Sequence, residues 1–342
     1  MKTSGDRVRL PHLQISRWSA CSQGCSKTAL IQLEDRISGG LIGLLVGDAL
    51  GVPYEFHSPD EIPPFAEIEF KPPPYFRRSH NVPPGTWSDD GAQALILLAS
   101  LNHCSKLDLD DFGRRLVNWY EHGYMAVDNH VFDIGIQTSH AIGNLVHGRS
   151  PETSGETSET ANGNGSLMRV LPMALWHTGS DEDLVNDAHR QSIVTHAHLR
   201  SQVCCALYCL WARCTLEGAS DSWTEAVSRL RRIYAEGSKA QEELEWSIRP
   251  DELIEGEGSG YVVDCLRSAR WVLNAGDYEQ VVKAAVALGR DTDTTACVAG
   301  GIAGIRDGVQ AIPERWRSQL RGKDLYEPEL EPLIRRRAPA SL

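Results

Sequence analysis

The chain has 342 residues, of which 41% are hydrophobic and 23% are charged, and this is the composition of a folded globular protein. Its formal net charge of −12 argues against a nucleic-acid partner, because phosphates bind best to basic surfaces. Nine cysteines without paired spacing favour neither a disulfide framework nor a zinc site. Neither an apolar leader nor an apolar run as long as a membrane span stands out, so we expect a cytoplasmic protein without membrane contact.

The first part of the chain, residues 1–35, is predicted to be a basic extension outside the main domain. Residues 1–36 carry six basic and three acidic side chains, so their charge is +3 and the rest of the chain holds −15. They show no sustained apolar period, although Leu10 and Trp18 stand among arginines. Aromatic and arginine side chains are typical of interfaces, so residues 1–33 are either a partner-binding arm or a strap on the acidic body of the same chain.

A single domain is predicted from residue 36 to residue 322, followed by a C-terminal tail at 323–342. It opens on an apolar helix at 41–51, whose glycines indicate close packing against a neighbour. Residues 53–85 are rich in proline, which excludes helix and central strand and predicts a long surface loop. Residues 150–165 are also irregular. Elsewhere helical periodicity recurs, and we predict an all-α fold with helices at 92–103, 108–121, 134–147, 166–178, 181–190, 197–217, 222–235, 261–274, 278–288, 294–306 and 313–320.

Two acidic clusters of similar design stand about two hundred residues apart. Ser88-Asp89-Asp90 precedes one predicted helix, and Asp291-Thr292-Asp293-Thr294 precedes another. Carboxylate and hydroxyl oxygens without Cys or His are the ligands of hard cations such as Mg²⁺, Mn²⁺ or Ca²⁺. Four converging carboxylates would suit two such ions, which can activate water. Either cluster alone could equally be an N-cap, because Ser and Asp are preferred cap residues.

Several motifs, taken in order, resemble those of the ADP-ribosylglycohydrolase family over residues 36–322. They are Gly47-Asp48-Ala49-Leu50-Gly51 with Glu55, Trp87-Ser88-Asp89-Asp90, Phe132-Asp133-Ile134-Gly135, Asn162-Gly163-Asn164-Gly165-Ser166-Leu167-Met168-Arg169, Thr195-His196, Gly289-Arg290-Asp291-Thr292-Asp293-Thr294, Gly300-Gly301-Ile302-Ala303-Gly304 and Ile312-Pro313. One departure is Gly91, where the family has Thr. The lost hydroxyl and the looser first turn reduce local rigidity more than they change the chemistry.

The resemblance implies a single compact all-α domain with a central cleft that holds two Mg²⁺ or Mn²⁺ ions. Cleavage would occur between ADP-ribose and an acceptor side chain. The catalytic carboxylates would be Asp89, Asp90 and Glu55, with either Asp89 or Glu55 as the base that takes the proton of the attacking water. The ligands implied for the metal ions are Ser88, Asp89, Asp90, Asp291, Asp293 and Thr294.

The resemblance also implies a set of substrate contacts, each with a structural alternative. The turn that contains Asn164, Gly165, Ser166 and Met168 would cradle the pyrophosphate and ribose, although a turn alone explains its glycines. His196 would touch the ligand. Asp133 is either a helix cap or the carboxylate that faces an acceptor guanidinium, and Tyr261 either packs in the core or stacks on the adenine or ribose.

Two functions of different classes follow from these features. The first is a metal-dependent hydrolase that removes ADP-ribose from a modified protein side chain, with arginine as the expected acceptor. The second is an immunity protein, or antidote, that binds an ADP-ribosyltransferase toxin through residues 1–33 and inhibits it, with or without hydrolysis.

Overall fold

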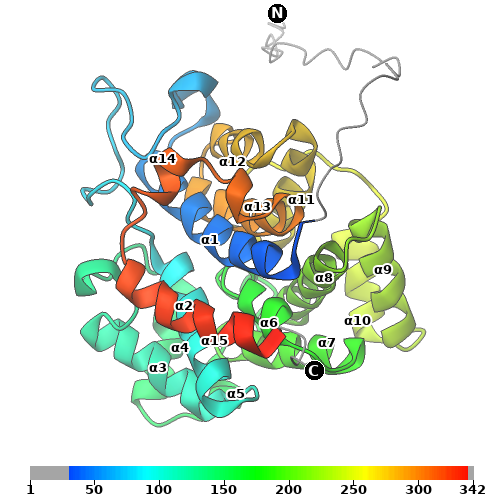
Figure 1. Ribbon diagram of the computed structural model, residues 1–342. Helices are drawn as coiled ribbons and strands as arrows, with labels where there is room; N and C mark the ends of the chain where they lie inside the picture. The colour runs from blue at the N-terminus through cyan, green and yellow to red at the C-terminus, as the bar shows by residue number, and fades with distance from the viewer. Residues whose placement is uncertain (1–30, 338–342) are drawn as a thin grey trace, which may run out of the picture. The chain divides into compact units, whose positions relative to one another are not determined.

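The computed structural model describes residues 31–337, which are α-helical and contain no β-strand beyond two isolated bridges (Figure 1). The predicted all-α class is confirmed. The described part has fifteen α-helices: α1 (Leu33–Gly51), α2 (Asp89–Cys104), α3 (Leu109–His122), α4 (Ile136–Val146), α5 (Pro151–Ser154), α6 (Leu171–Trp176), α7 (Asp181–Ile193), α8 (Leu199–Leu216), α9 (Ser222–Ile233), α10 (Lys239–Glu242), α11 (Val262–Val272), α12 (Tyr278–Ala287), α13 (Thr292–Asp307), α14 (Glu314–Arg317) and α15 (Lys323–Arg337).

The helical body extends past residue 322, where we expected the domain to end. Helix α15 continues to Arg337, lies beside α2 in Figure 1, and buries Tyr326, Leu330 and Leu333. Two prolines inside it remove backbone donors, and this interrupts the sequence pattern of a helix. The predicted N-terminal arm, by contrast, lies almost wholly outside the described residues.

Some predicted helices have different bounds. The helix expected at 166–178 begins only at Leu171, because the residues before it form turns. The helix expected from residue 197 begins at Leu199, with the His198 side chain accepting the Arg200 N–H as its cap. A π-helix at Glu243–Ile248 was not predicted.

Helix α1 is part of an apolar stretch as long as a membrane span, which we did not expect anywhere in the chain. The stretch Leu33–Tyr54 has the length and mean hydropathy, 1.4, of a membrane span. However, 94% of its most apolar window is buried inside the described body, as in the core helix of a globular fold. Its apolar character is therefore explained by packing within the protein.

The packing partner of α1 is α13, and glycines bring the two backbones together. A Cβ atom on Gly47 would lie 2.1 Å from the Ala296 carbonyl oxygen, and one on Gly51 would lie 2.3 Å from Asp293 Cα. Such distances are too short for any side chain, so the predicted close packing is confirmed. Because Thr292 Oγ1 also donates to Gly51 O at 2.8 Å, the end of α1 is fixed beside the start of α13.

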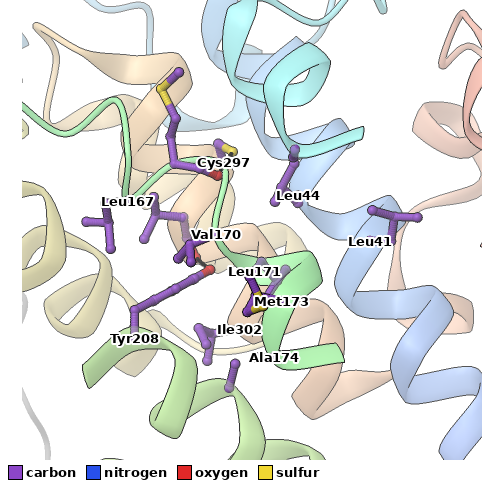
Figure 2. Packing of buried hydrophobic residues seen from close by; sticks show 14 of the residues in the cluster. Leu41, Leu44, Leu167, Val170, Leu171, Met173, Ala174, Tyr208, Cys297 and Ile302 are labelled. Carbon is purple, nitrogen blue, oxygen red and sulfur yellow. Dashed lines mark hydrogen bonds between the residues drawn. The ribbon is translucent and has the colours of Figure 1, made fainter. Parts of the chain in front are cut away.

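The hydrophobic core continues from α1 and α13 to α6 and α8. Figure 2 shows Leu41 and Leu44 of α1, residues of α6 and the turn before it, and Tyr208 of α8 around α13. The buried Tyr208 hydroxyl donates to the Val298 carbonyl at 2.8 Å, so its one polar atom is satisfied.

The proline-rich segment between α1 and α2 contains only three short 3₁₀ turns, as expected of a loop: Val52–Tyr54, Pro59–Glu61 and Phe65–Glu67. It is nonetheless attached to the body through Glu69. The carboxylate of Glu69 accepts from Arg315 at 2.9 Å, and its backbone N–H donates to Tyr54 Oη at 2.9 Å. These contacts fix the segment that carries Glu55.

Candidate metal and substrate site

The first acidic cluster forms the N-terminal turn of α2 and is held by a buried carboxylate of α1. Asp48 accepts the Ser88 N–H at 2.8 Å through Oδ1 and the Gly91 N–H at 2.7 Å through Oδ2. Ser88 is the N-cap, as one of our two interpretations required, and its hydroxyl also donates to Asp90 Oδ2 at 3.0 Å. A Cβ on residue 91 would meet Trp87 Cγ at 2.8 Å, so close packing against Trp87 is a reason for glycine at this position.

The second acidic cluster forms the N-terminal turn of α13. Asp291 occupies the cap position, but its side chain makes no capping bond to the helix and instead accepts from Asn164 Nδ2 at 2.8 Å. Thr294 donates from Oγ1 to Asp90 Oδ2 at 3.3 Å. That bond joins the two clusters, which are separated by about two hundred residues of sequence.

The structure therefore brings both clusters together, and Glu55 with them. Oxygen atoms of Asp48, Asp90 and Asp293 lie within 4.8 Å of one another, and so do those of Glu55, Asp291 and Asp293. Glu55 is buried, and its Oε2 lies 2.6 Å from His80 Nε2. Three separate parts of the chain thus place carboxylates in one buried cluster.

Ionisation of the carboxylates in this cluster is unfavourable when no other charge is bound to the protein. Burial raises the pKa of Asp89, Asp90 and Asp293 well above the usual range for Asp, and the neighbouring carboxylates raise it further. Burial and the charge of Asp133 likewise raise the pKa of Glu55. Among residues 31–337, no lysine or arginine forms an ion pair with any of these four carboxylates, and His80 alone pairs with Glu55.

These residues fit a hard divalent cation. Asp90 Oδ1 and Asp293 Oδ2 are buried and have no hydrogen-bond partner within the described range. Buried carboxylate oxygens are rarely left in that state, because burial removes them from water without replacement. Apart from the His80 nitrogen, the potential ligand atoms in the cluster are carboxylate or hydroxyl oxygens, as Mg²⁺ and Mn²⁺ prefer.

A hydrogen-bonded chain behind α2 orients Asp89. Its Oδ2 accepts from Gln93 Nε2 at 2.9 Å, Gln93 Oε1 accepts from Arg169 at 2.9 Å, and Arg169 also donates to Gln191 Oε1 at 3.0 Å. Arg169 is fully buried, and burial lowers its pKa to about 10. No local sequence pattern marks Gln93 or Gln191 as residues of the site.

The glycine turn lies against the second acidic cluster. Asn164 donates its amide to Asp291, and its backbone N–H donates to Gly260 O at 3.0 Å. The turn therefore connects the start of α13 to the residues before α11. The turn thus stands beside the Asp291 carboxylate.

A model of the ADP-ribosylglycohydrolase family matches residues 29–341, which is nearly the whole chain. The chain belongs to the ADP-ribosylglycohydrolase family. The match includes α15 and so agrees with the longer body seen in the structure.

Individual relatives agree with this assignment. The chain is 31% identical over 292 residues to the ADP-ribosylarginine hydrolase Tri1 of Serratia proteamaculans, covering 84% of this chain and 75% of that protein. It is 32% identical over 306 residues to Tri1 of Pseudomonas putida, covering 88% and 77%. It is 28% identical over 314 residues to the ADP-ribosyl-dinitrogen reductase glycohydrolase of Rhodospirillum rubrum, covering 91% and 96%.

A solved structure gives the same result for the fold. An ADP-ribosylglycohydrolase-related protein complex superposes with a TM-score of 0.73 at 30% identity, covering 90% of this chain and 100% of that chain. The protein is therefore a hydrolase of the ADP-ribosylglycohydrolase family with acidic groups that could bind metal.

In this ADP-ribosylglycohydrolase, Asp133 is not the cap of α4, because Gly135 occupies that position. Asp133 has a left-handed backbone with φ of 59°, which is rare for residues other than glycine. Its carboxylate lies within 4.8 Å of Glu55 and His80 ligand atoms, and burial raises its pKa. Strain of this kind is concentrated at functional sites.

The other predicted substrate contacts occupy different environments. Ser166 is fully buried and accepts from Ser192 Oγ at 2.8 Å, and Met168 packs in the core. Because both side chains point into the protein interior, this part of the turn can contact a ligand only through its backbone atoms. Tyr261 is 41% exposed, precedes α11, and its hydroxyl accepts from Arg200 at 3.4 Å.

His196 lies beneath the glycine turn and is buried. Its Nδ1 is 2.8 Å from the Thr195 hydroxyl, and burial lowers its pKa to about 3, so the imidazole is neutral. A Cβ on Gly165 would lie 2.7 Å from the His196 Cε1 atom, which shows why that position is glycine. A neutral histidine suits hydrogen bonding to a ligand.

Sequence reasoning missed two residues of the acidic cluster, Asp48 and His80. Asp48 lies within a helix that is otherwise apolar, and a buried charge in such a helix is a signal that could have been used. His80 follows a proline-rich stretch with no motif around it, so only the folded loop brings it to Glu55.

Proposed function

We propose that this protein hydrolyses the bond between ADP-ribose and an arginine side chain. The observation that carries the proposal is the largely buried cluster of Glu55, Asp89, Asp90, Asp291 and Asp293, which forms no ion pair with a lysine or arginine of the described residues. Burial lowers the pKa of the neighbouring His80, which favours its neutral form. The arginine acceptor is supported by relatives described as ADP-ribosylarginine hydrolases at 31% and 32% identity.

The proposal includes two divalent cations, Mg²⁺ or Mn²⁺. The residues that would hold them are Ser88, Asp89, Asp90, Asp291, Asp293 and Thr294, with Asp48 behind them. When bound, such ions supply Lewis-acid activation of water and a template for the ribose hydroxyls. The carboxylates would then be ionised, although burial and mutual repulsion favour their protonated forms in the protein alone.

The protein's own groups would orient the substrate. The glycine turn and His196 would hold the ADP-ribose portion, and the exposed Tyr261 ring would offer a stacking surface. The Asp133 carboxylate, beside Glu55, would accept hydrogen bonds from the guanidinium of the acceptor. Together these contacts would hold the bond to be broken next to the carboxylates.

Two carboxylates are candidates for the proton acceptor. Asp89 is oriented by Gln93, whereas Glu55 lies on the proline-rich segment beside His80. Asp90 accepts from Ser88 and Thr294 through one oxygen, which leaves the other for a cation. The matched variants Asp89→Asn and Glu55→Gln, compared at saturating metal, identify the acceptor by the larger loss of kcat.

The test of the proposed function is a panel of acceptors. The protein is incubated with ADP-ribosyl-arginine, ADP-ribosyl-serine and O-acetyl-ADP-ribose in Mg²⁺, and released ADP-ribose is measured. We expect release from the arginine adduct at the highest kcat/KM. Preference for the serine adduct would contradict the arginine assignment, and no release from any of the three would contradict hydrolysis.

We propose a second function on a different observation, the difference in net charge between the N-terminal segment and the rest of the chain. Residues 1–36 carry +3 and the remainder −15. A basic arm could bind the acidic cleft of an ADP-ribosyltransferase and inhibit it directly.

We also propose a reducing, cytoplasmic location, which the seven free thiols in the described range support.

A further inference from the structure

Gln137, the second residue of α4, faces the glycine turn and has a fixed amide orientation. Its Oε1 accepts the Gly163 N–H at 2.8 Å. Because a backbone N–H can only be paired with the oxygen of the amide, the Nε2 group must point away from Gly163. The oxygen of the Gln137 amide is therefore hydrogen-bonded to the turn.

The other end of the same amide is unpaired. Gln137 Nε2 is buried and has no hydrogen-bond partner among residues 31–337. A buried amide nitrogen carries two N–H donors, and in folded proteins nearly all such donors are satisfied. This nitrogen is therefore an exception among the buried polar atoms of the described range, and an added hydrogen-bond acceptor would satisfy it.

The glycine turn beside Gln137 is also bordered by polar side-chain atoms of His196 and Thr138. A Cβ on Gly163 would lie 2.7 Å from Gln137 Oε1 and 3.4 Å from His196 Nε2, so both side chains border a position kept free by glycine. His196 has its Nδ1 directed at Thr195, which leaves Nε2 on the side of the turn. Thr138 Oγ1 would lie 3.1 Å from a Cβ on Gly165.

We propose that Gln137 is a substrate-positioning residue whose Nε2 donates to a pyrophosphate oxygen of ADP-ribose. This inference rests on the proposed function and assigns one residue to it. Pyrophosphate oxygens only accept hydrogen bonds and carry negative charge, so they match a group of neutral donors around a glycine turn. Through Oε1 the same side chain holds the turn, and through Nε2 it holds the ligand.

Two substitutions separate these two roles. Gln137→Glu keeps an oxygen for the Gly163 N–H but replaces the Nε2 donor with a second, negatively charged oxygen. Gln137→Met removes both the acceptor and the donor at similar size. The matched control is Gln280→Glu on α12, since Gln280 Oε1 also accepts a backbone N–H, that of Asp277, at 3.0 Å.

The measurement is the affinity of the full-length protein for ADP-ribose and for ADP by calorimetry in Mg²⁺, with the melting temperature and the KM and kcat of hydrolysis alongside. We expect Gln137→Glu to weaken both nucleotides by about ten- to hundredfold, with a melting temperature close to that of the parent. KM should rise more than kcat falls. Gln280→Glu should change none of these values.

The outcomes distinguish this inference from the proposed function. If Gln137→Glu binds both nucleotides as the parent does, the inference is overturned, whether or not the enzyme is active. If only Gln137→Met weakens binding, the residue merely holds the turn and the inference is again overturned. If the parent itself neither binds ADP-ribose nor hydrolyses an adduct, the proposed function fails first.

Discussion

Asp293 lies in the first turn of α13, after the cap residue Asp291, and one of its two carboxylate oxygens has no partner in the described range. Its Oδ1 accepts the Thr294 N–H at 2.9 Å, but its Oδ2 is buried and unpaired within residues 31–337. The fully buried Asp90 also has one unpaired oxygen, Oδ1, whereas its Oδ2 accepts from the hydroxyls of Ser88 and Thr294. Two unpaired oxygens in one acidic cluster are better explained by a bound cation than by capping.

Replacing one of these carboxylates should abolish hydrolysis without unfolding the protein. We expect Asp293→Asn and Asp89→Asn to lower kcat/KM by at least about a hundredfold, a loss comparable to removing a strong charge-assisted contact. Mg²⁺ should raise the melting temperature of the parent more than that of either variant. The control is the exposed Asp110→Asn in α3. Near-parental rates in both variants at saturating Mg²⁺ would contradict the metal site.

Asp133 allows a second test at the residue scale. If its carboxylate holds a guanidinium, Asp133→Ala should lower kcat/KM for ADP-ribosyl-arginine by about ten- to hundredfold. The affinity for free ADP-ribose should hardly change, because that ligand lacks the acceptor. An equal loss for free ADP-ribose would assign Asp133 to the scaffold.

At the scale of elements, α1 and α13 determine where the acidic residues lie. Gly47→Ala would place a Cβ 2.1 Å from a backbone oxygen, so the helices must separate. We expect a loss of about 1–3 kcal/mol in unfolding free energy and weaker Mg²⁺ binding. The matched control is Gly143→Ala in α4, where nothing lies within 4 Å of the new Cβ and helix propensity predicts a gain of about 0.5–1 kcal/mol. Equal effects of the two changes in chemical denaturation would refute this account of the contact.

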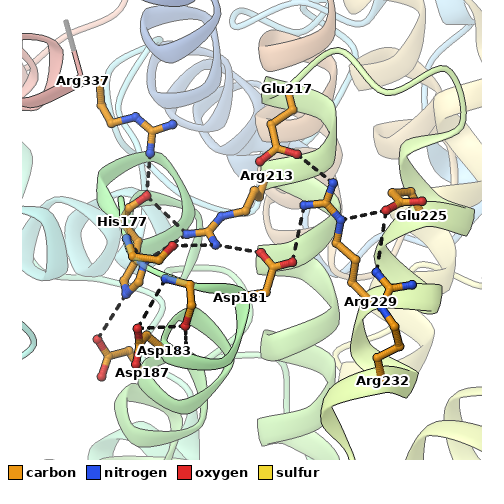
Figure 3. Close-up of polar contacts among 12 residues, drawn as sticks. His177, Asp181, Asp183, Asp187, Arg213, Glu217, Glu225, Arg229, Arg232 and Arg337 are labelled. Carbon is orange, nitrogen blue, oxygen red and sulfur yellow. Dashed lines mark hydrogen bonds and ion pairs between the residues drawn. The ribbon is translucent and has the colours of Figure 1, made fainter. Parts of the chain in front are cut away.

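A second element-scale feature joins α6, α7 and α8 through His177. Figure 3 shows Arg213 of α8 directed at both His177 and Asp181. The His177 Nδ1 accepts from Arg213 at 3.0 Å and from the Gly179 N–H at 3.1 Å. Burial, followed by the charge of Arg213, lowers the pKa of His177 to about 4. The folded protein therefore holds this histidine in its neutral form.

The pH dependence of stability follows from that shift. The unfolded chain binds a proton near pH 6.5 and the folded chain only near pH 4, so stability is constant above this window and falls as the pH drops through it. The loss should be at most about 3 kcal/mol. His177→Gln, which cannot be protonated, should reduce that loss in denaturation curves from pH 7.5 to pH 4. An unchanged slope would show that His177 does not contribute.

Sequence reasoning succeeded for elements whose signal is local. The helix that follows Ser88-Asp89-Asp90 and the glycines of α1 are visible as a cap and as small residues in an apolar run. It failed for α15, whose internal prolines break the pattern, and for the start of α6, where a turn replaces an expected helix. In those places tertiary packing overrides the local preference.

The residues of the site likewise divide into those that a local sequence pattern marks and those that only the fold brings together. Ser88, Asp90 and Asp293 could be found because hydroxyls and carboxylates cluster in sequence. His80 and Gln93 could not, because no local pattern marks them: His80 reaches Glu55 only through the folded loop, and Gln93 contacts Asp89 from one turn further along α2. Asp48 carries a sequence signal, a charge in an apolar helix, but its contact with Ser88 is set by tertiary packing. Gln137 is similar, since its importance lies in an unpaired nitrogen that no pattern reveals.

At the scale of the whole molecule, the charge difference between residues 1–36 and the remainder gives a prediction about a partner. A catalytically inactive chain such as Asp89→Asn, with its N-terminus intact, should still inhibit a target ADP-ribosyltransferase. Deleting residues 1–30, which spares α1, should remove that protection but leave hydrolysis unchanged. An inactive full-length chain that gives no protection would leave hydrolysis as the only function.

The claim that matters most for the whole molecule is that its buried carboxylates are a cation site that supports hydrolysis. The most direct test is to strip the protein of metal and titrate it with Mg²⁺ or Mn²⁺, following ion binding by calorimetry and ADP-ribose release from ADP-ribosyl-arginine. We predict no release without ions, and release that rises in step with the binding of two ions per chain. Undiminished hydrolysis by the stripped protein, or ion binding that Asp293→Asn leaves unchanged, would contradict the account.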